Sequence, residues 1–177
     1  IIKNEAPWIE RALSSVAWCD EIVVVDSGST DGTIQAINAP QKPWSSKLKF
    51  LEEPWRGYAG QRNFAMGQAR NDWVFFLDGD EACSPELAQK IQTLQNPEGK
   101  HFQIRRQEYF LGRPILHGTW NPSYHVRLFH RKEAVFEREI HEDVSLSSEK
   151  VQIQDPIYHC ENLRIERLLE KMNRYTS

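Results

Sequence analysis

The first half of the chain switches repeatedly between helical and strand-like patterns of apolar residues. Apolar residues with helical spacing occur in four segments: 4–17, 31–38, 58–69 and 85–94. Short apolar runs bounded by turn residues, typical of buried strands, lie at 22–25, 48–51 and 73–77. We expect Asn4 to cap the first helix, and Ser84 with Pro85 to begin the fourth. Strands that alternate with helices predict an α/β fold with a mostly parallel central sheet.

After Gly99 the pattern changes to strands without helices between them. Strand-like segments lie at 101–111, 124–130, 134–137 and 151–159, and an amphipathic helix is expected at 162–175. A length of 177 residues suits one domain with a single core, so we expect an α/β half at 1–99 and a mixed half at 100–177. No Met opens the chain, and Ile1-Ile2 resembles the tail of a strand, so both ends are expected to be truncated.

The composition is that of an ordinary globular protein. Hydrophobic residues make up 40% and charged residues 27%, and the net charge of −3 gives no support for nucleic-acid binding. No apolar run approaches the roughly 20 residues that span a bilayer. Cys19, Cys83 and Cys160 are scattered without CxxC spacing, which favours reduced thiols in the cytoplasm over disulfides or zinc.

Charge is distributed unevenly in the second half. Segment 100–132 has seven Lys or Arg residues and one acid, whereas 133–149 has six acids and one Arg. Two solvated faces would explain this pattern. The alternative is a basic rim for an anionic partner beside an acidic centre. The arginines suited to bind phosphate or carboxylate groups there are Arg105, Arg106, Arg113 and Arg127.

Two acidic residues, Asp78 and Asp80, directly follow the apolar run 73–77. Positions i and i+2 of a strand point the same way, so both carboxylates are expected to face one point. Such a pair at the carboxyl end of a strand favours a divalent cation and, through it, a phosphate. Asp26 ends an earlier strand in the same manner, although the turn formers after it also fit a simple capped strand-to-helix turn.

Other motifs that place acids or glycines in loops do not match. An EF-hand loop from Asp26 would need acidic or amide residues where Gly28 and Thr30 stand. Neither a P-loop nor a dinucleotide-binding glycine pattern is present. An Asp-x-Asp phosphatase motif would need Thr or Val where Ala82 stands.

Six separated segments together resemble the inverting glycosyltransferases of family two, which have the GT-A fold. The matching segments are Lys3-Asn4-Glu5, IVVVDSGSTDGT at 22–33, GQRN at 60–63, FFLDGDE at 75–81, Arg127-Leu128-Phe129 and REIHED at 138–143. The chain is most similar to the bacterial group that adds glucose β-1,4 to heptose in the inner core of lipopolysaccharide or lipooligosaccharide. The resemblance implies a nucleotide-sugar-binding half at 1–99 and an acceptor-binding half at 100–177.

The resemblance also implies roles in donor binding. Asp26 would bind the uracil or ribose of a UDP-sugar, and Arg62 would contact the base. Asp78 would bind the ribose or reach the metal through water. Asp80 would coordinate Mn²⁺ or Mg²⁺ at the diphosphate, because such hard cations prefer oxygen ligands. The family usually has a second Asp where Ser27 stands, which weakens the inference for base contacts.

Further roles concern the acceptor and the metal. Glu142, or alternatively Asp143, would be the base that removes the acceptor proton, with His141 orienting it. His159, at the end of the last strand, would be an imidazole ligand of the metal. Trp120 is a candidate platform for the acceptor sugar, or simply a core residue.

The resemblance therefore predicts a metal-dependent transfer of glucose from UDP-glucose onto an anionic glycolipid or other cell-envelope glycan. The location would be cytoplasmic, with peripheral contact to the inner membrane through the helix at 162–175 as a further option. Alternatives are transfer to a protein, peptide or exopolysaccharide, a phosphatase with Asp78 as nucleophile, and a nucleotide-sugar-binding module without activity.

Overall fold

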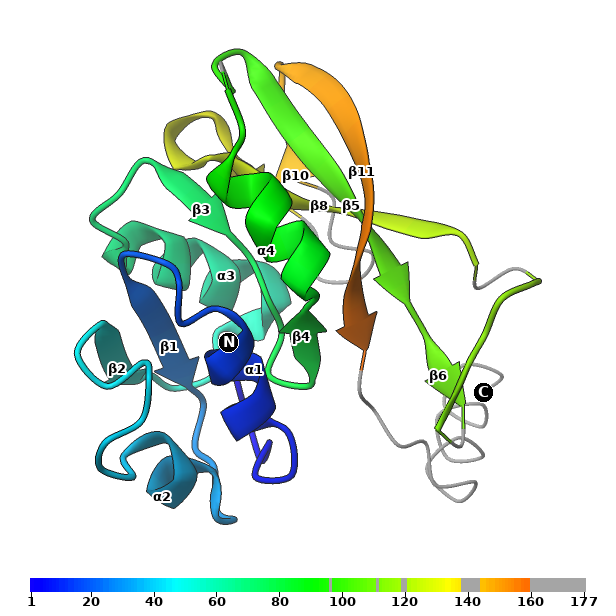
Figure 1. Cartoon of the computed structure of the whole chain (residues 1–177). Coiled ribbons are helices and arrows are strands. Elements are labelled where there is room, and N and C mark those ends of the chain that lie inside the picture. Colours follow the sequence, from blue (N-terminus) through cyan, green and yellow to red (C-terminus); the bar gives the residue numbers. More distant parts are fainter. Residues whose placement is uncertain (96, 111, 119–120, 138–143, 160–177) are drawn as a thin grey trace, which may run out of the picture.

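The computed structural model describes residues 1–95, 97–110, 112–118, 121–137 and 144–159, which form an α/β fold (Figure 1). The helices are α1 (Ile9–Ser15), α2 (Thr33–Ile37), α3 (Gly57–Gln68) and α4 (Pro85–Gln92), with a 3₁₀ turn at Arg131–Glu133. The strands are β1 (Ile22–Asp26), β2 (Leu48–Glu52), β3 (Trp73–Phe75), β4 (Glu81–Cys83), β5 (Lys100–Gln107), β6 (Tyr109–Phe110), β7 (Arg113–Pro114), β8 (Ser123–His130), β9 (Val135–Phe136), β10 (Val144–Ser145) and β11 (Glu149–His159).

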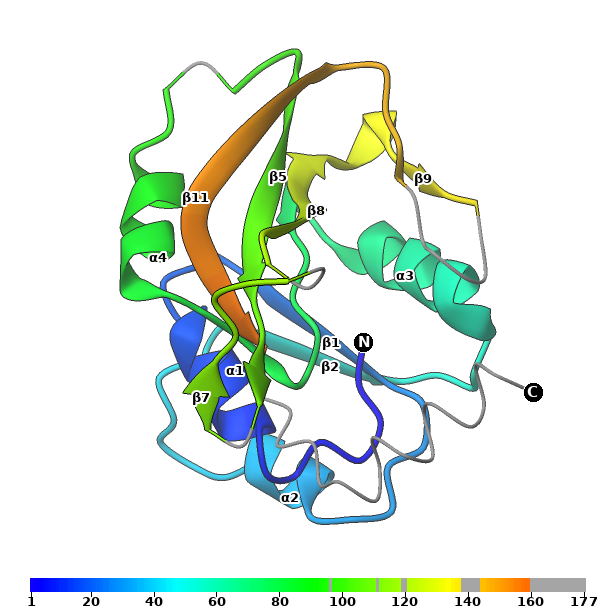
Figure 2. The same ribbon diagram turned by 90° about the vertical axis from the view of Figure 1, so that its right-hand side faces the viewer.

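The largest sheet is mixed and has the strand order β3-β8-β5-β11-β4. Its long, curved strands β5 and β11 run side by side and parallel, as Figures 1 and 2 show, whereas its other neighbours are antiparallel. Strand β1 pairs in parallel with β2 in a separate sheet. The α/β class is as expected, but parallel strand pairs in the described residues are confined to β1–β2 and β5–β11. Strand β8 returns beside β5 without a crossover helix, and such a connection gives an antiparallel pair.

Two predicted helix starts have different outcomes. The cap of α4 is confirmed, since the hydroxyl of Ser84 accepts a hydrogen bond from Leu87 N at 3.1 Å. The prediction that Asn4 caps α1 is wrong, because the helix begins only at Ile9. The side chain of Asn4 instead accepts a hydrogen bond from Thr30 N at 2.8 Å. Asn4 thus fastens the amino-terminal segment to the turn after β1.

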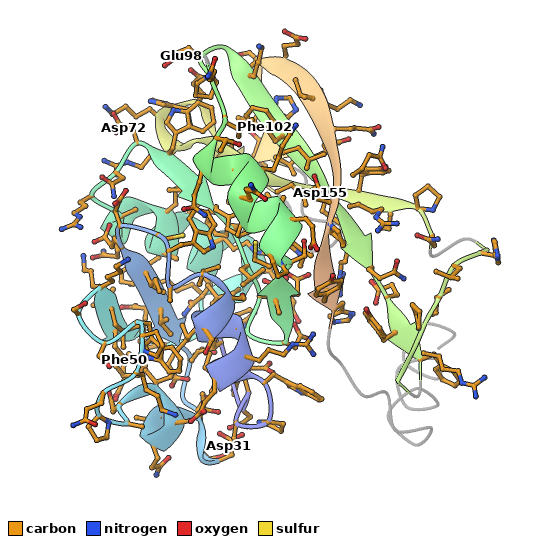
Figure 3. The ribbon with its side chains drawn as sticks, in the orientation of Figure 1. Asp31, Phe50, Asp72, Glu98, Phe102 and Asp155 are labelled. Atoms are coloured by element: carbon orange, nitrogen blue, oxygen red, sulfur yellow. The ribbon has the colours of Figure 1, made fainter. Side chains whose placement is uncertain are left out.

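The main core lies between α1, α4, β1 and the mixed sheet, with Phe102 of β5 inside it and Phe50 of β2 packed against it (Figure 3). A second cluster lies between α3 and the β8–β9 region. There Phe76 stacks on Phe129 with ring centroids 5.6 Å apart and contacts Phe136 edge-on at 5.2 Å. This second cluster anchors the chain two residues before Asp78.

A largely apolar cavity of about 500 Å³ lies between β1 and β3. Ile2 enters it in extended form, since its N donates to Val25 O at 2.9 Å and its O accepts from Ser27 N at 3.1 Å. Ile2 forms an isolated parallel bridge to Asp26, consistent with the expected strand-like conformation.

Cys19 and Cys83 are free thiols. Burial raises the pKa of Cys19 to about 11 and that of Cys83 to about 12, so both are protonated and unreactive at neutral pH. Cys160 and the helix expected at 162–175 lie outside the described residues. Among the helices that the structure describes, none has the length and apolarity needed to cross a membrane.

Candidate active site

A second cavity, of about 660 Å³, lies where β1, α3, the turn after β3 and the end of β11 meet. The amino-terminal segment and β5 also contribute to its wall, and the charged and polar side chains there are Lys3, Glu5, Ser27, Arg62, Asp78, Asp80, Arg106 and His159. These residues are far apart in sequence, so only the fold brings them together. Four of the predicted site residues are among them.

The segment Asp78-Gly79-Asp80 is a turn and not part of a strand. Strand β3 ends at Phe75, and the turn is closed by a hydrogen bond from Glu81 N to Asp78 O at 3.0 Å. The prediction that the two carboxylates point the same way by strand alternation is therefore wrong. Asp78 contacts Arg62 and Arg127, whereas Asp80 contacts His159, although both acids line the same cavity.

The carboxylate of Asp78 is held by two arginines. One oxygen accepts a hydrogen bond from Arg62 at 3.1 Å, and the other accepts from both terminal nitrogens of Arg127 at 3.1 and 3.2 Å. Burial alone would raise the pKa of Asp78, but Arg127 and Arg62 outweigh burial and hold the pKa far below its usual range. Asp78 is thus ionised and fixed in place.

Arg127 and Arg106 belong to this acidic cluster. Arg127 is 6% exposed and donates to Glu81 at 2.7 Å, and Arg106 lies 3.1 Å from the same Glu81 oxygen. The hypothesis that Arg127 faces an acceptor on a basic rim is therefore wrong, whereas Arg113 in β7 is exposed. Arg127 is 49 residues from Asp78, and no local pattern predicts that pair.

His159 lies between two carboxylates at the end of β11. Its Nε2 is 3.0 Å from Asp80 Oδ2, and its Nδ1 is 2.5 Å from Glu108 Oε2. Burial alone would lower the pKa of His159, but the hydrogen bonds with Asp80 and Glu108 raise it to about 9. The imidazole is thus a cation at neutral pH, and it lowers the pKa of Asp80 against the opposing effect of burial.

Asp26 is fully buried and holds the turn after β1. Its Oδ2 accepts hydrogen bonds from Gly28 N at 2.9 Å and Ser29 N at 2.8 Å, and its Oδ1 accepts from the Ser29 hydroxyl. Gly28 has φ of +90°, which favours glycine. The capped-turn interpretation thus describes this geometry, and Ser27 is the residue that lines the cavity. Contact of Asp26 with a nucleotide stays a prediction.

An aromatic pair that the sequence interpretation missed flanks the cavity. Trp55 and Tyr58 are 48% and 51% exposed, and their rings meet edge-on with centroids 4.8 Å apart. Tyr58 precedes Arg62 by one helical turn on α3, so both side chains lie on the same face of that helix. The sequence could have indicated this pair, because two aromatic residues precede Arg62, the residue predicted to contact the base. The contact of Arg62 with a base stays a prediction.

The predicted base, Glu142 or Asp143, lies outside the described residues, as do His141 and Trp120. Their roles stay predictions.

The residues at the turn fit part of a divalent-cation site. In the described ranges, no group of three or more His, Cys, Asp or Glu residues is arranged to hold a metal ion. Asp80 Oδ2 and His159 Nε2 nevertheless lie 3.0 Å apart. Adjacent ligands of an octahedral cation with bonds of about 2.1 Å are separated by about 3.0 Å. The two atoms could therefore bind one cation whose remaining ligands are oxygens of a diphosphate or of water.

Gly79 is required by close packing. A Cβ at this position would lie 2.7 Å from Glu5 Cγ and 2.9 Å from Ile2 Cγ2. We expect Gly79→Ala to destabilise the protein by about 1–3 kcal/mol, because the amino-terminal segment or the turn must shift. Urea unfolding would measure this, with Gly67→Ala as the control, since its Cβ would meet open space. Equal stability of the two variants would contradict the packing argument.

Solved structures with the same fold are nucleotide-sugar transferases. A mannosyltransferase from Pyrobaculum calidifontis, solved with GDP-Man and Mn²⁺, matches with a TM-score of 0.65 and 22% identity over 92% of this chain and 56% of that chain. TarS (residues 1–349) of S. aureus, solved with UDP-GlcNAc, matches with a TM-score of 0.62 and 19% identity over 92% and 56%. The fold is thus the GT-A fold of these transferases.

The sequence comparisons define the family. The model of glycosyl transferase family 2 matches residues 1–145, so the chain belongs to the family 2 glycosyltransferases. An uncharacterised glycosyltransferase of Rickettsia bellii is 32% identical over 99% of this chain and 63% of its own length. LpsC of Rhizobium meliloti, a lipopolysaccharide core biosynthesis glycosyltransferase, is 32% identical over 81% and 54%. The chain spans less than two thirds of these curated relatives.

Proposed function

We propose that this chain belongs to an inverting, metal-dependent glycosyltransferase that moves glucose from UDP-glucose onto a lipopolysaccharide core or another cell-envelope glycan. The name of the Rhizobium meliloti relative supports this class of acceptor. The ligands named for the two structural neighbours, UDP-GlcNAc and GDP-Man with Mn²⁺, support a nucleotide-sugar donor and a divalent cation.

The observation that carries this proposal is the pair formed by Asp80 and His159. Both side chains line the same cavity, with their metal-binding atoms 3.0 Å apart, and Arg106 lies at the same wall. A carboxylate and an imidazole at this spacing suit Mn²⁺, and guanidinium groups suit phosphate oxygens. The cavity therefore offers cationic and metal-binding groups to a diphosphate.

The residues of the chain would have distinct tasks in the reaction. Asp80 and His159 would hold Mn²⁺ or Mg²⁺, which when bound neutralises charge that develops on the departing UDP. Arg62 would bind the base, and Asp78 would bind the ribose while it keeps Arg62 oriented. Glu142 or Asp143 would take the proton of the acceptor hydroxyl, whose oxygen attacks the anomeric carbon as the bond to UDP breaks.

The phosphatase alternative is disfavoured by the contacts of Asp78. A nucleophilic carboxylate needs an oxygen that faces the phosphorus atom, whereas both oxygens of Asp78 bind arginines. Two alternatives are distinguished from the proposal by the titration and turnover experiments described below. One is transfer to a protein, peptide or exopolysaccharide, and the other is a binding module without activity.

The proposal places the enzyme in the cytoplasm, which the free thiols of Cys19 and Cys83 support. Peripheral contact with the inner membrane through the expected helix at 162–175 is a further part of the proposal. An anionic glycolipid acceptor would bring the enzyme to that surface.

Calorimetric titration of UDP and UDP-glucose, with and without Mn²⁺, tests the proposal. We expect Mn²⁺ to tighten binding by at least about tenfold, or about 1.4 kcal/mol. Turnover would then be compared across lipopolysaccharide-core, peptide and exopolysaccharide acceptors. Lack of binding under all conditions would refute the glycosyltransferase proposal. Binding of UDP-glucose without turnover on any acceptor would instead favour a module without activity.

A further inference from the structure

Both ring nitrogens of His159 are engaged, and only one of them faces the cavity. Nε2 is directed to Asp80, which lines the cavity, and Nδ1 is directed to Glu108 at 2.5 Å. Glu108 itself does not line the cavity wall. The side chain of His159 is therefore placed between a carboxylate at the site and a carboxylate behind it.

The strand register sets Glu108 beside His159. Strands β5 and β11 are parallel, with Gln107, the last residue of β5, opposite Tyr158. Glu108 directly follows β5 and His159 ends β11, and this places His159 Nδ1 2.5 Å from Glu108 Oε2. The backbone of Glu108 is fixed in turn, since its carbonyl accepts hydrogen bonds from Ile115 N at 2.9 Å and from the Gln107 side chain at 3.0 Å. The position of Glu108 is thus a property of the sheet and of the hairpin that follows it.

The carboxylate of Glu108 is also oriented. Its Oε1 lies 3.1 Å from Nε of Arg106, while Oε2 binds His159. Arg106 lies in β5, two residues before Glu108, and the same Nε is also 3.1 Å from Glu81 Oε1. Oε1 of Glu108 thus lies beside a cationic group, and Oε2 is the oxygen that meets Nδ1 of His159.

We propose that Glu108 is a positioning residue that accepts the Nδ1–H of His159 and so makes Nε2 the metal-binding nitrogen. This inference rests on the proposed function, because it requires a cation between Asp80 and His159. A neutral imidazole carries one N–H, and an ionised carboxylate at Nδ1 keeps that proton there. The Nε2 lone pair then faces Asp80, and the charge of Glu108 makes it a better ligand.

Replacement of Glu108 by Gln tests the role of the carboxylate with little change in shape. The amide can accept from Nδ1 or donate to it, so it no longer selects a tautomer. We expect Mn²⁺ affinity in the presence of UDP to fall by about 10–100-fold, the usual effect of losing the outer partner of a metal-binding His. Electron paramagnetic resonance of free Mn²⁺ would measure it. UDP affinity without metal should be unchanged.

Glu149→Gln is the matched control, because Glu149 is exposed at the opposite end of β11. It should leave Mn²⁺ affinity unchanged. Should Glu108→Gln fail to fold, Glu108→Asp retains a carboxylate and should keep part of the affinity. The tautomer can also be observed in the unaltered protein by long-range ¹H–¹⁵N spectra of the Mg²⁺–UDP form, with Nδ1 protonated and Nε2 free of a proton.

The outcomes separate this inference from the proposed function. If the unaltered protein binds Mn²⁺ with UDP but Glu108→Gln binds it equally well, the positioning role of Glu108 is overturned and the glycosyltransferase proposal stands. A His159 ring with its proton on Nε2 in the Mg²⁺–UDP form would overturn it as well. If the unaltered protein binds no Mn²⁺, the metal-dependent function and the role of Glu108 fail together.

Discussion

Replacement of Asp80 by Asn is expected to remove Mn²⁺-dependent binding of UDP-glucose, with a loss of at least about 100-fold in metal-dependent affinity. The amide keeps the size of the side chain but offers a cation only a neutral oxygen. Asp80 also makes the hydrogen bond that, with Glu108, raises the pKa of His159 to about 9. The variant thus loses one proposed ligand and changes the protonation of the other. Calorimetry with and without Mn²⁺, together with UDP release, would measure both losses.

Asp72→Asn is the matched control for this experiment. Asp72 lies at the outer edge of the molecule in Figure 3, where it pairs with Lys132 at 2.9 Å. Such an exposed ion pair contributes about 0–1 kcal/mol, so the control should bind UDP-glucose as the unaltered protein does. Metal-dependent affinity that survives in Asp80→Asn would refute the role of Asp80, provided that urea unfolding shows a folded variant.

The two acids of the Asp78-Gly79-Asp80 turn have different electrostatic surroundings. The charge of Asp78 is neutralised by the permanent cations Arg62 and Arg127. Asp78 therefore needs no metal ion to balance its charge. Asp80 is neutralised by His159, whose charge depends on one proton. A divalent cation that replaces that proton could bind both groups after a small rotation of the side chains. This difference in surroundings supports the proposal that Asp80, and not Asp78, binds the cation, a distinction that two identical residues in a sequence do not reveal.

Local patterns predicted most of the elements that carry the site. The β-branched run at 22–25 became β1, the helical spacing at 58–69 became α3, and the Ser84-Pro85 start became α4. These predictions succeeded because period and capping act within a few residues. Strand β4 was missed, since three residues give no period and only pairing with β11 makes them a strand.

Long-range pairs explain what the sequence could not predict in the site. Glu108 meets His159 across 51 positions through the register of β5 and β11, and Arg127 meets Glu81 across 46. Neither pair leaves a periodic signal. The error about Asp78 and Asp80 has a related cause, because β3 ends at Phe75 and the carboxylate of Asp78 is held by Arg62 and Arg127. Tertiary contacts thus overrode the strand periodicity.

Replacement of Arg127 by Met is expected to destabilise the fold by about 3–5 kcal/mol, as the breaking of a buried ion pair does. Arg127 is buried and contacts both Asp78 and Glu81, which would then pair with Arg62 and Arg106 respectively. Met fills similar space without charge, so the effect measures the lost ion pairs. Urea unfolding followed by tryptophan fluorescence would give the free energy of unfolding. Arg113→Met, at an exposed position of β7, should change it by no more than about 0.5 kcal/mol.

The pH dependence of stability gives an independent check on the role of Arg127. The pKa of Asp78 is lower in the folded protein than in the unfolded chain. Its contribution to stability is therefore fully present above the unfolded pKa of about 3.9 and is lost as the pH falls towards the lower folded value. Without Arg127, the folded pKa of Asp78 must rise, so Arg127→Met should lose less further stability on acidification than the unaltered protein. Parallel acid-unfolding curves for the two proteins would show that Arg127 does not stabilise the charge on Asp78.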